Sequence, residues 1–262
     1  MPLSPDQWHT RYSRQAGWTQ QLRRYLFKRA GIQSARLVLD CGCGTGALEA
    51  DAGGLDSTFE GICVGLDIDP INLAYAKSLG VEFPLSQGDA LRLPFAGGTF
   101  DITFCHFLLL WVGDPLRALQ ELRRVTRPGG CVLALAEPDY GGRIDFPPEL
   151  ELLGSWQQAS LRSQGANPWI GRRLGWMFHQ TGLEEIETGV LGAHWSGSPS
   201  NDELESEWAV LNSDLEIMLG TGDDAPWQAE FDKLKRLDEI TWKHGERVLY
   251  VPTFYAIGKN LG

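Results

Sequence analysis

The chain has 262 residues, 43% of them hydrophobic, and a formal net charge of −11. Its length suffices for a complete core, and it shows neither a signal peptide nor a membrane-spanning apolar run, so we expect a soluble cytoplasmic protein with no membrane partner. Residues 199–240 hold twelve acidic side chains against three basic ones. A phosphate-binding surface needs the opposite sign, which argues against nucleic acid as a partner.

Residues 5–30 have the spacing of an amphipathic helix or helix pair. The side chains expected on one face are Trp8, Tyr12, Gln15, Thr19 and Leu22. We therefore treat residues 1–30 as an N-terminal helical cap segment, which precedes a larger domain at 31–262.

Residues 36–138 alternate apolar runs with helix signals and short connections. The apolar runs are 36–41, 61–67, 81–86, 100–105 and 131–136. Proline cannot donate to a strand ladder, so the third run, which contains Pro84, should lie at a sheet edge. Asp69-Pro70 and Asp114-Pro115 are typical helix starts. This alternation predicts a parallel, doubly wound α/β sheet with its ligand site at the carboxyl ends of the strands.

Beyond residue 138 the alternation stops and helix signals dominate. We expect helices near 148–164, 170–181, 200–219 and 226–243, a strand near 185–195, and a last strand at 247–259. The domain at 31–262 would therefore carry helical insertions at about 139–168 and 197–245.

The five cysteines form an odd set that falls within or beside the predicted strands. Cys41 and Cys43 make a CxC pair, but no second Cys/His pair follows at zinc-like spacing. We interpret the cysteines as small buried apolar residues, predict no metal site, and note that reduced thiols fit the cytoplasm.

The segment LVLDCGCGTG at 37–46 predicts a buried strand, a tight turn and a helix start, with backbone N–H groups open to a ligand. Taken alone, its glycines also fit a dinucleotide fingerprint, since Asp67 lies 21 residues after Gly46. Asp40 before the turn would repel a pyrophosphate, however, and Asp89 after the third strand could accept from an adenine amino group. These acids favour an amino-acid nucleoside over a dinucleotide.

Five segments in this order and spacing resemble the motifs of class I S-adenosylmethionine-dependent methyltransferases. They are LVLDCGCGTG, GLDIDP, QGDALRLPF, FDITFCHFLLLWVGDP and LRRVTRPGGCVLALAEP, followed by a family-like final strand, FYAIGK. The resemblance is to the small-molecule type, similar to the group acting in ubiquinone and menaquinone biosynthesis. It implies a Rossmann-like sheet of seven strands, order 3-2-1-4-5-7-6, with strand 7 antiparallel and a helical cap.

The resemblance also implies S-adenosylmethionine as cofactor and S-adenosylhomocysteine as product. Carried over position by position, the cofactor-binding residues are Asp40, Cys41, Gly42, Gly44, Gly46, Asp67, Ile68, Asp89, Ala90, Cys105 and His106. The glycines would lie against the methionine part, Asp67 would accept from the ribose hydroxyls, and Ile68 would pack on adenine. Asp89 would accept from the adenine amino group. His106 would sit beside the sulfonium, where we prefer a role as a wall contact over a role as a general base.

The methyl acceptor should be a small molecule held by the cap. The expected lining residues are Tyr12, Gln15, Trp18, Trp111, Tyr140 and His194. Each could equally be a packing residue, and Tyr12 and Tyr140 are preferred. The alternatives are an NAD-dependent oxidoreductase and a non-catalytic cofactor-binding regulatory subunit. We expect a monomer or a homodimer.

Overall fold

The computed structural model describes the chain except for residues 1–3, 51–54, 192–198 and 221–225. It divides into two compact units, each taken by itself. The sheet unit comprises Ser4–Pro138, Ile170–Leu191 and Thr253–Gly262. The helical unit comprises Asp139–Trp169 and the described part of 192–252.

The sheet unit is built on seven strands in the order β3-β2-β1-β4-β5-β9-β7. Their bounds are β1 Leu37–Cys41, β2 Ile62–Asp67, β3 Leu85–Gln87, β4 Phe100–Cys105, β5 Thr126–Pro138, β7 Glu184–Leu191 and β9 Thr253–Lys259. The first five are parallel, and β9 runs antiparallel to both of its neighbours. Counted along the chain within this sheet, the order is 3-2-1-4-5-7-6, which confirms the predicted topology.

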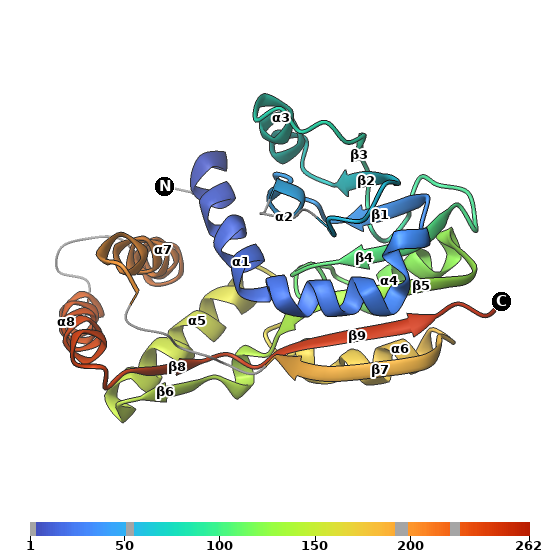
Figure 1. The fold of residues 1–262 in the computed structure, drawn as a ribbon. Helices are drawn as coiled ribbons and strands as arrows, with labels where there is room; N and C mark the ends of the chain where they lie inside the picture. The colour runs from blue at the N-terminus through green and yellow to red at the C-terminus, as the bar shows by residue number, and fades with distance from the viewer. Residues whose placement is uncertain (1–3, 51–54, 192–198, 221–225) are drawn as a thin grey trace. The chain divides into compact units, whose positions relative to one another are not determined.

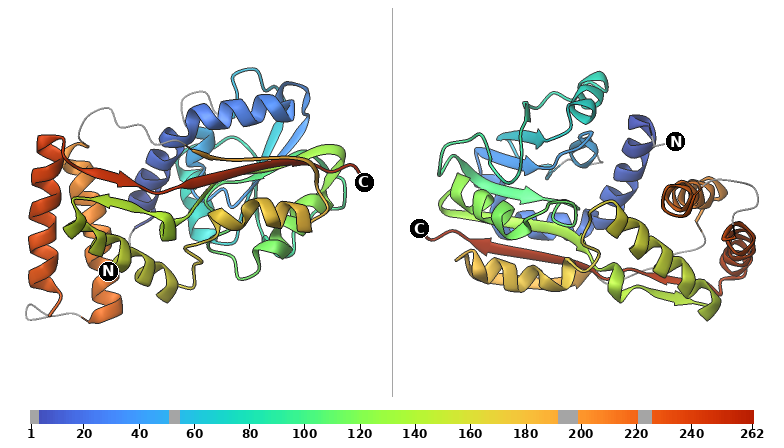
Figure 2. Two further views of the ribbon diagram at one scale, coloured as in Figure 1. Left: turned by 90° about the horizontal axis from the view of Figure 1, so that it is seen from below. Right: turned by 180° about the vertical axis from the view of Figure 1, so that it is seen from behind.

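Helices cover both faces of this sheet. They are α1 Pro5–Ala30, α2 Ala47–Ala50, α3 Pro70–Ser78, α4 Pro115–Val125 and α6 Leu174–Gln180, with 3-10 turns η1 Ile32–Ser34 and η4 Gly171–Arg173. Figures 1 and 2 show α1 on one face of the sheet and α4 with α6 on the other. Asp69 and Asp114 cap α3 and α4 as predicted, each accepting a backbone N–H at 2.9 Å.

The core of the sheet unit lies between α1 and the central strands. Leu26 and Phe27 of α1 pack with Val38, Phe104 and Leu133, all fully buried. The rings of Phe27 and Phe104 meet edge to face with centroids 5.2 Å apart. Because these apolar positions occupy the second half of α1, that half is fixed to the sheet by hydrophobic burial.

The helical unit has its own core. Its elements are η2 Tyr140–Gly142, β6 Ile144–Phe146, η3 Pro148–Leu150, α5 Glu151–Ser163, α7 Asn201–Leu219, α8 Gln228–His244 and β8 Val248–Tyr250. Leu150 and Leu153 from the first segment pack with Trp208, Trp227 and Phe231 from the second. Neither segment alone therefore completes this core.

Two strand predictions need correction at prolines. The single strand expected at 247–259 is two strands, β8 and β9, which separate at Val251-Pro252 and belong to different units. The strand expected at 81–86 begins only after Pro84, whose carbonyl accepts the Gly65 N–H at 2.9 Å. Both differences follow from the missing N–H of proline, which interrupts a ladder.

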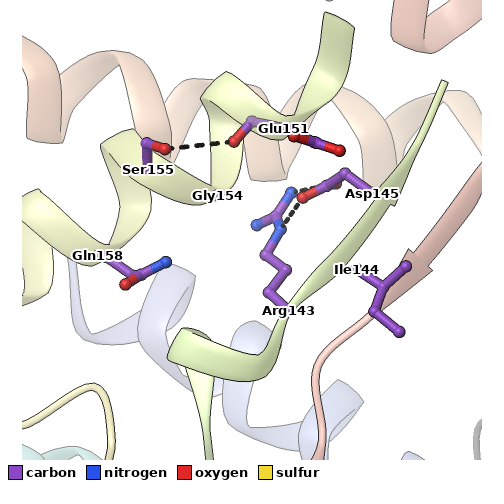
Figure 3. Close-up of a pocket in the computed structure, with 7 residues that line it drawn as sticks. All are labelled: Arg143, Ile144, Asp145, Glu151, Gly154, Ser155 and Gln158. Carbon is purple, nitrogen blue, oxygen red and sulfur yellow. Dashed lines mark hydrogen bonds and ion pairs between the residues drawn. The ribbon is translucent and has the colours of Figure 1, made fainter. Parts of the chain in front are cut away.

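The helical unit also holds a pocket of about 400 Å³ beside an ion network (Figure 3). Its lining residues are Arg143, Ile144, Asp145, Glu151, Gly154, Ser155 and Gln158. The Asp145 carboxylate accepts from Arg143 and Arg247, and Arg247 Nε donates to Asp238 at 2.6 Å. Asp145 is thus paired with arginines of the protein itself, and none of the lining residues was predicted as part of a site.

Candidate functional site

The predicted glycine loop follows β1 and leads into α2. Gly42, Gly44 and Gly46 have φ values of 84°, 54° and 71°, in the left-handed region that glycine adopts without strain. The N–H groups of Gly42 and Cys43 both donate to the Leu66 carbonyl, at 2.7 and 3.0 Å, so they are not open to a ligand, contrary to the sequence prediction. A Cβ on Gly42 would lie 2.9 Å from Leu108 Cδ1. A side chain at Gly42 is therefore disfavoured by the positive φ, and it would also require Leu108 to move.

Asp67 ends β2 and holds this loop directly. Its Oδ2 accepts the Gly44 N–H at 2.8 Å, and its Oδ1 accepts the Asp69 N–H at 2.9 Å. The carboxylate is half-buried, and desolvation raises its pKa against the opposing effect of these backbone donors. The following residue, Ile68, exposes 65% of its surface beside it. An acid and an uncovered apolar side chain thus stand together at the carboxyl end of β2.

Asp89 and Ala90 follow β3, the next strand of the sheet. Asp89 is exposed, and its Oδ1 accepts the Leu91 N–H at 2.8 Å, while Ala90 is buried. Because β1, β2 and β3 are parallel neighbours, the glycine loop, Asp67 and Asp89 lie along one carboxyl edge. The sequence predicted this alignment.

Beneath the glycine loop lies a pair of carboxyl groups, of which the sequence pointed to Asp40 but not to Glu49. Asp40 is buried against Glu49 of α2, and burial together with this second carboxyl raises the pKa of Asp40 well above its usual range. Asp40 Oδ1 and Glu49 Oε2 have no hydrogen-bond partner of their own in the described part of the chain. A proton shared between the two facing carboxyls satisfies both atoms. The signal for Glu49 was an acid in the first turn after the loop.

All five cysteines are free and buried, as interpreted from their spacing. Burial raises the pKa of the Cys105 thiol well above its ordinary value, so this residue at the end of β4 stays protonated. Among the residues that the structure describes, no group of three or more His, Cys, Asp or Glu side chains could hold a metal ion.

His106 follows β4 and faces α1. Its Nε2 lies 2.9 Å from the Thr19 hydroxyl, and Arg23 Nη1 donates to that same hydroxyl at 2.9 Å. Burial, followed by the nearby Arg23 charge, lowers the pKa of His106 to about 3. The imidazole is therefore neutral near pH 7 and is a weak proton acceptor. Arg23 was missed by the sequence analysis because nothing in its spacing marks it as a partner of a strand end.

The burial of His106 leads to a prediction about how stability depends on pH. In the unfolded chain His106 gains a proton below about pH 6.5, whereas the folded form resists protonation until about pH 3. The free energy of unfolding should therefore fall as pH drops from 7 to 5, and His106→Gln should reduce that slope. Urea denaturation at several pH values measures it. His244→Gln, at an exposed position, serves as control, and equal slopes in the wild type and His106→Gln would contradict the assignment.

The first half of α1 covers the glycine loop. The Tyr12 ring lies 3.3 Å from the position of a Cβ on Gly44, and His9 Nδ1 lies 2.8 Å from the Thr45 hydroxyl. Burial, with the nearby Asp67 and Asp69 charges, raises the pKa of Tyr12 to about 12. The helix thus brings a neutral phenol to the predicted site.

The other residues predicted to line the acceptor pocket have fewer contacts with the glycine loop than Tyr12. Gln15 is half-buried on the Tyr12 side of α1, whereas Trp18 exposes 67% of its surface and is not brought against the loop. The backbone N–H of Trp111 donates to the Leu108 carbonyl at 2.9 Å, next to the site. Tyr140 belongs to the helical unit, and His194 lies outside the described residues. Their roles stay predictions.

The sheet order and this edge define a Rossmann-like domain with a cofactor-type glycine loop. Residues 39–134 match the family model described as a methyltransferase domain. This segment is similar to the class I S-adenosylmethionine-dependent methyltransferases in its motifs, and the sheet has their strand order. No helix in the described ranges is long and apolar enough to cross a membrane.

Relatives support the same family. The chain is 37% identical over 129 residues to the ubiquinone/menaquinone biosynthesis C-methyltransferase UbiE of Bdellovibrio bacteriovorus, covering 48% of this chain and 52% of that protein. An uncharacterized methyltransferase of Schizosaccharomyces pombe is 36% identical over 160 residues, with 55% and 56% covered. The chain thus spans about half the length of these curated relatives. A demethylmenaquinone methyltransferase of Bacillus cereus is 29% identical, with 72% and 88% covered.

Solved structures share the fold. A putative methyltransferase in complex with the Haloferax volcanii Trm112 methyltransferase activator superposes with a TM-score of 0.58 at 19% identity, covering all of both chains. A Haemonchus contortus phosphoethanolamine N-methyltransferase, solved with phosphomonomethylethanolamine and S-adenosylhomocysteine, gives 0.56 at 20% identity, covering 93% of this chain and 53% of that one.

Proposed function

We propose that the protein transfers the methyl group of S-adenosylmethionine to a small-molecule acceptor and releases S-adenosylhomocysteine. The observation that carries this proposal is the alignment of the glycine loop, Asp67 and Asp89 on one edge of a sheet with methyltransferase order. An amino-acid nucleoside has a charged end, a ribose and a base in that order. The glycine loop, Asp67 and Asp89 follow one another along the edge in the same order as these three parts.

The residues present fit this cofactor. Gly42, Gly44 and Gly46 carry no side chain that would block the methionine part, and Leu108 and Tyr12 lie against the first two of them. Asp40, paired with Glu49 beneath the loop, would shape it. At the end of β2, Asp67 would accept from the ribose hydroxyls and Ile68 would cover adenine. The exposed carboxylate of Asp89, with Ala90 beside it, would meet the adenine amino group. Cys105 and His106 would form the wall near the sulfonium.

The cofactor supplies, when bound, a methyl group on a sulfonium that is already strongly electrophilic. The chain therefore needs to align and desolvate the reacting groups rather than activate them. Its wall residues suit that task, because the Cys105 thiol is protonated and His106 is neutral and committed to Thr19. Tyr12 and Leu108 would exclude water above the loop, and no acid or base is assigned.

The acceptor is proposed only as a small molecule. The strongly acidic segment at 199–240 disfavours nucleic acid, and the side chains at Tyr12, Gln15 and Trp111 offer mixed apolar and polar contacts. Trp18, Tyr140 and His194 remain further candidates for the acceptor pocket. We propose a cytoplasmic monomer or homodimer.

Calorimetry with three ligands tests the cofactor assignment. We expect S-adenosylmethionine and S-adenosylhomocysteine to bind with micromolar affinity and NAD to show no binding, because the acids at this edge would repel a pyrophosphate. Tight NAD binding without a response to S-adenosylhomocysteine would instead support an oxidoreductase. Binding without turnover, in a mass-spectrometric screen for labelled methyl transfer into metabolite extracts, would support the regulatory alternative.

A further inference from the structure

Glu137, near the end of β5, is completely buried yet carries an ionisable group. Its Oε1 accepts the N–H groups of Leu108 and Leu109, both at 3.0 Å, and its Oε2 accepts the Leu110 N–H at 3.3 Å. Three successive backbone N–H groups thus converge on one carboxylate. Such an arrangement is a nest for an anion, here supplied by the protein itself.

The loop that surrounds this carboxylate has an unusual backbone. Phe107 has a φ of 54°, which is uncommon for a bulky residue, and its N–H donates to the Ala136 carbonyl at 2.9 Å. The next turn closes when Trp111 donates to Leu108. A strained residue persists only where its surroundings hold it, and Glu137 supplies three of the bonds that do so.

The same loop borders the cofactor edge. Cys41 and Cys105 are register partners in β1 and β4, so the segments that follow them lie side by side. Leu108 contacts Gly42 so closely that a Cβ there would lie 2.9 Å from Leu108 Cδ1. The position of Leu108 therefore sets the space above the first glycine of the loop.

We propose that Glu137 is a positioning residue for the cofactor site, whose carboxylate fixes residues 107–111 so that Leu108 forms one wall of the glycine loop. This inference rests on the proposed function. Glu137 itself touches no reacting atom in this scheme and acts through Leu108.

A purely structural role accounts poorly for the choice of side chain. Burying a carboxylate is unfavourable, and a neutral side chain that accepts hydrogen bonds would suffice for folding. Burial raises the pKa of Glu137 to about 7, although the three backbone donors lower it. The titratable group packed against it is the Cys105 thiol of β4, 3.9 Å from Oε1, which stays protonated. Protonation below pH 7 would remove one acceptor and loosen the loop at Leu110.

The test compares Glu137→Gln with Thr126→Val by calorimetry with S-adenosylhomocysteine at pH 8 and pH 6. Gln keeps the shape, but its amide N–H₂ would meet the Leu110 N–H donor. Thr126 is also buried in β5, and its hydroxyl bonds Thr103 at 2.9 Å and the Leu122 carbonyl at 2.7 Å, away from the loop. Hydrogen exchange of peptides that cover 106–112 reports on the loop without any ligand.

We expect wild-type affinity to fall between pH 8 and pH 6. Glu137→Gln should weaken binding about tenfold or more at pH 8, speed exchange in 106–112, and show no such fall. Thr126→Val should lower the unfolding temperature and keep wild-type affinity. Unchanged affinity and exchange in Glu137→Gln, or equal losses of affinity in both variants, would overturn this inference but not the proposed function. A wild-type protein that does not bind S-adenosylhomocysteine would overturn the proposed function and the inference with it.

Discussion

Replacing Asp145 with alanine is expected to lower the free energy of unfolding by about 3–5 kcal/mol, the range for breaking a buried ion pair from one side. The Asp145 carboxylate accepts from Arg143 Nε at 2.7 Å, Arg143 Nη2 at 2.9 Å and Arg247 Nη2 at 2.6 Å. The Arg247 side chain is 1% exposed, so its charge cannot turn to water. Among the described residues, Arg247 would keep Asp238 as its one carboxylate partner, and Arg143 would keep no carboxylate partner.

Urea denaturation followed by circular dichroism measures this effect. A matched control is Glu230→Ala in α8, which removes an exposed pair with Lys233 at 3.1 Å and should change stability by less than about 1 kcal/mol. Because the chain has two units, the loss should appear in the transition assigned to the helical unit. Equal small effects in both variants would mean that solvent reaches Arg143 and Arg247.

The second large effect is expected at the cofactor edge. Asp67→Ala should weaken S-adenosylhomocysteine binding by about 1.5–3 kcal/mol, or roughly 10- to 150-fold, the range for hydrogen bonds to a charged partner. Two losses combine here: the proposed ribose contacts, and the bond to the Gly44 N–H that shapes the glycine loop.

The control for Asp67 is Asp101, at the opposite end of the sheet. Asp101 Oδ2 also accepts two backbone N–H groups, from Arg36 at 2.7 Å and Leu37 at 2.9 Å, but at the start of β4. Asp101→Ala should reduce stability and leave affinity unchanged in calorimetry. If both variants bind like the wild type, Asp67 is not the ribose acid.

The strand order and the glycine loop were predictable because they depend on short segments: apolar runs, helix caps, and glycines where φ must be positive. The division of 247–259 into β8 and β9 was not, although Pro252 was visible. Periodicity shows that a segment is extended but not which strand it joins. Pairing is decided by partners more than 100 residues away, as when Ile144 meets Tyr250.

The same limit explains the missed site residues. Thr19 and His106 are 87 positions apart, and Leu108 and Glu137 are 29 apart, so neither pair forms a motif that can be recognised in sequence. In the sequence, Glu137 is only the polar residue at which an apolar run ends, so nothing marks it as a buried carboxylate. What the sequence did supply was the edge at which these side chains meet, since parallel strands end together.

The helical unit is assembled from two stretches of chain, 139–169 and the described part of 192–252, and this has a consequence for synthesis. On the ribosome, Leu150 and Leu153 emerge well before Trp208, Trp227 and Phe231, with which they share a core. At about 5–20 residues per second, the nascent chain carries these leucines uncovered for several seconds. In the same interval β5 lacks its antiparallel neighbour β9, which is synthesised more than 100 residues later. The sheet can therefore be completed only after β9 has been synthesised, and the core of the helical unit only after α7 and α8 have been synthesised.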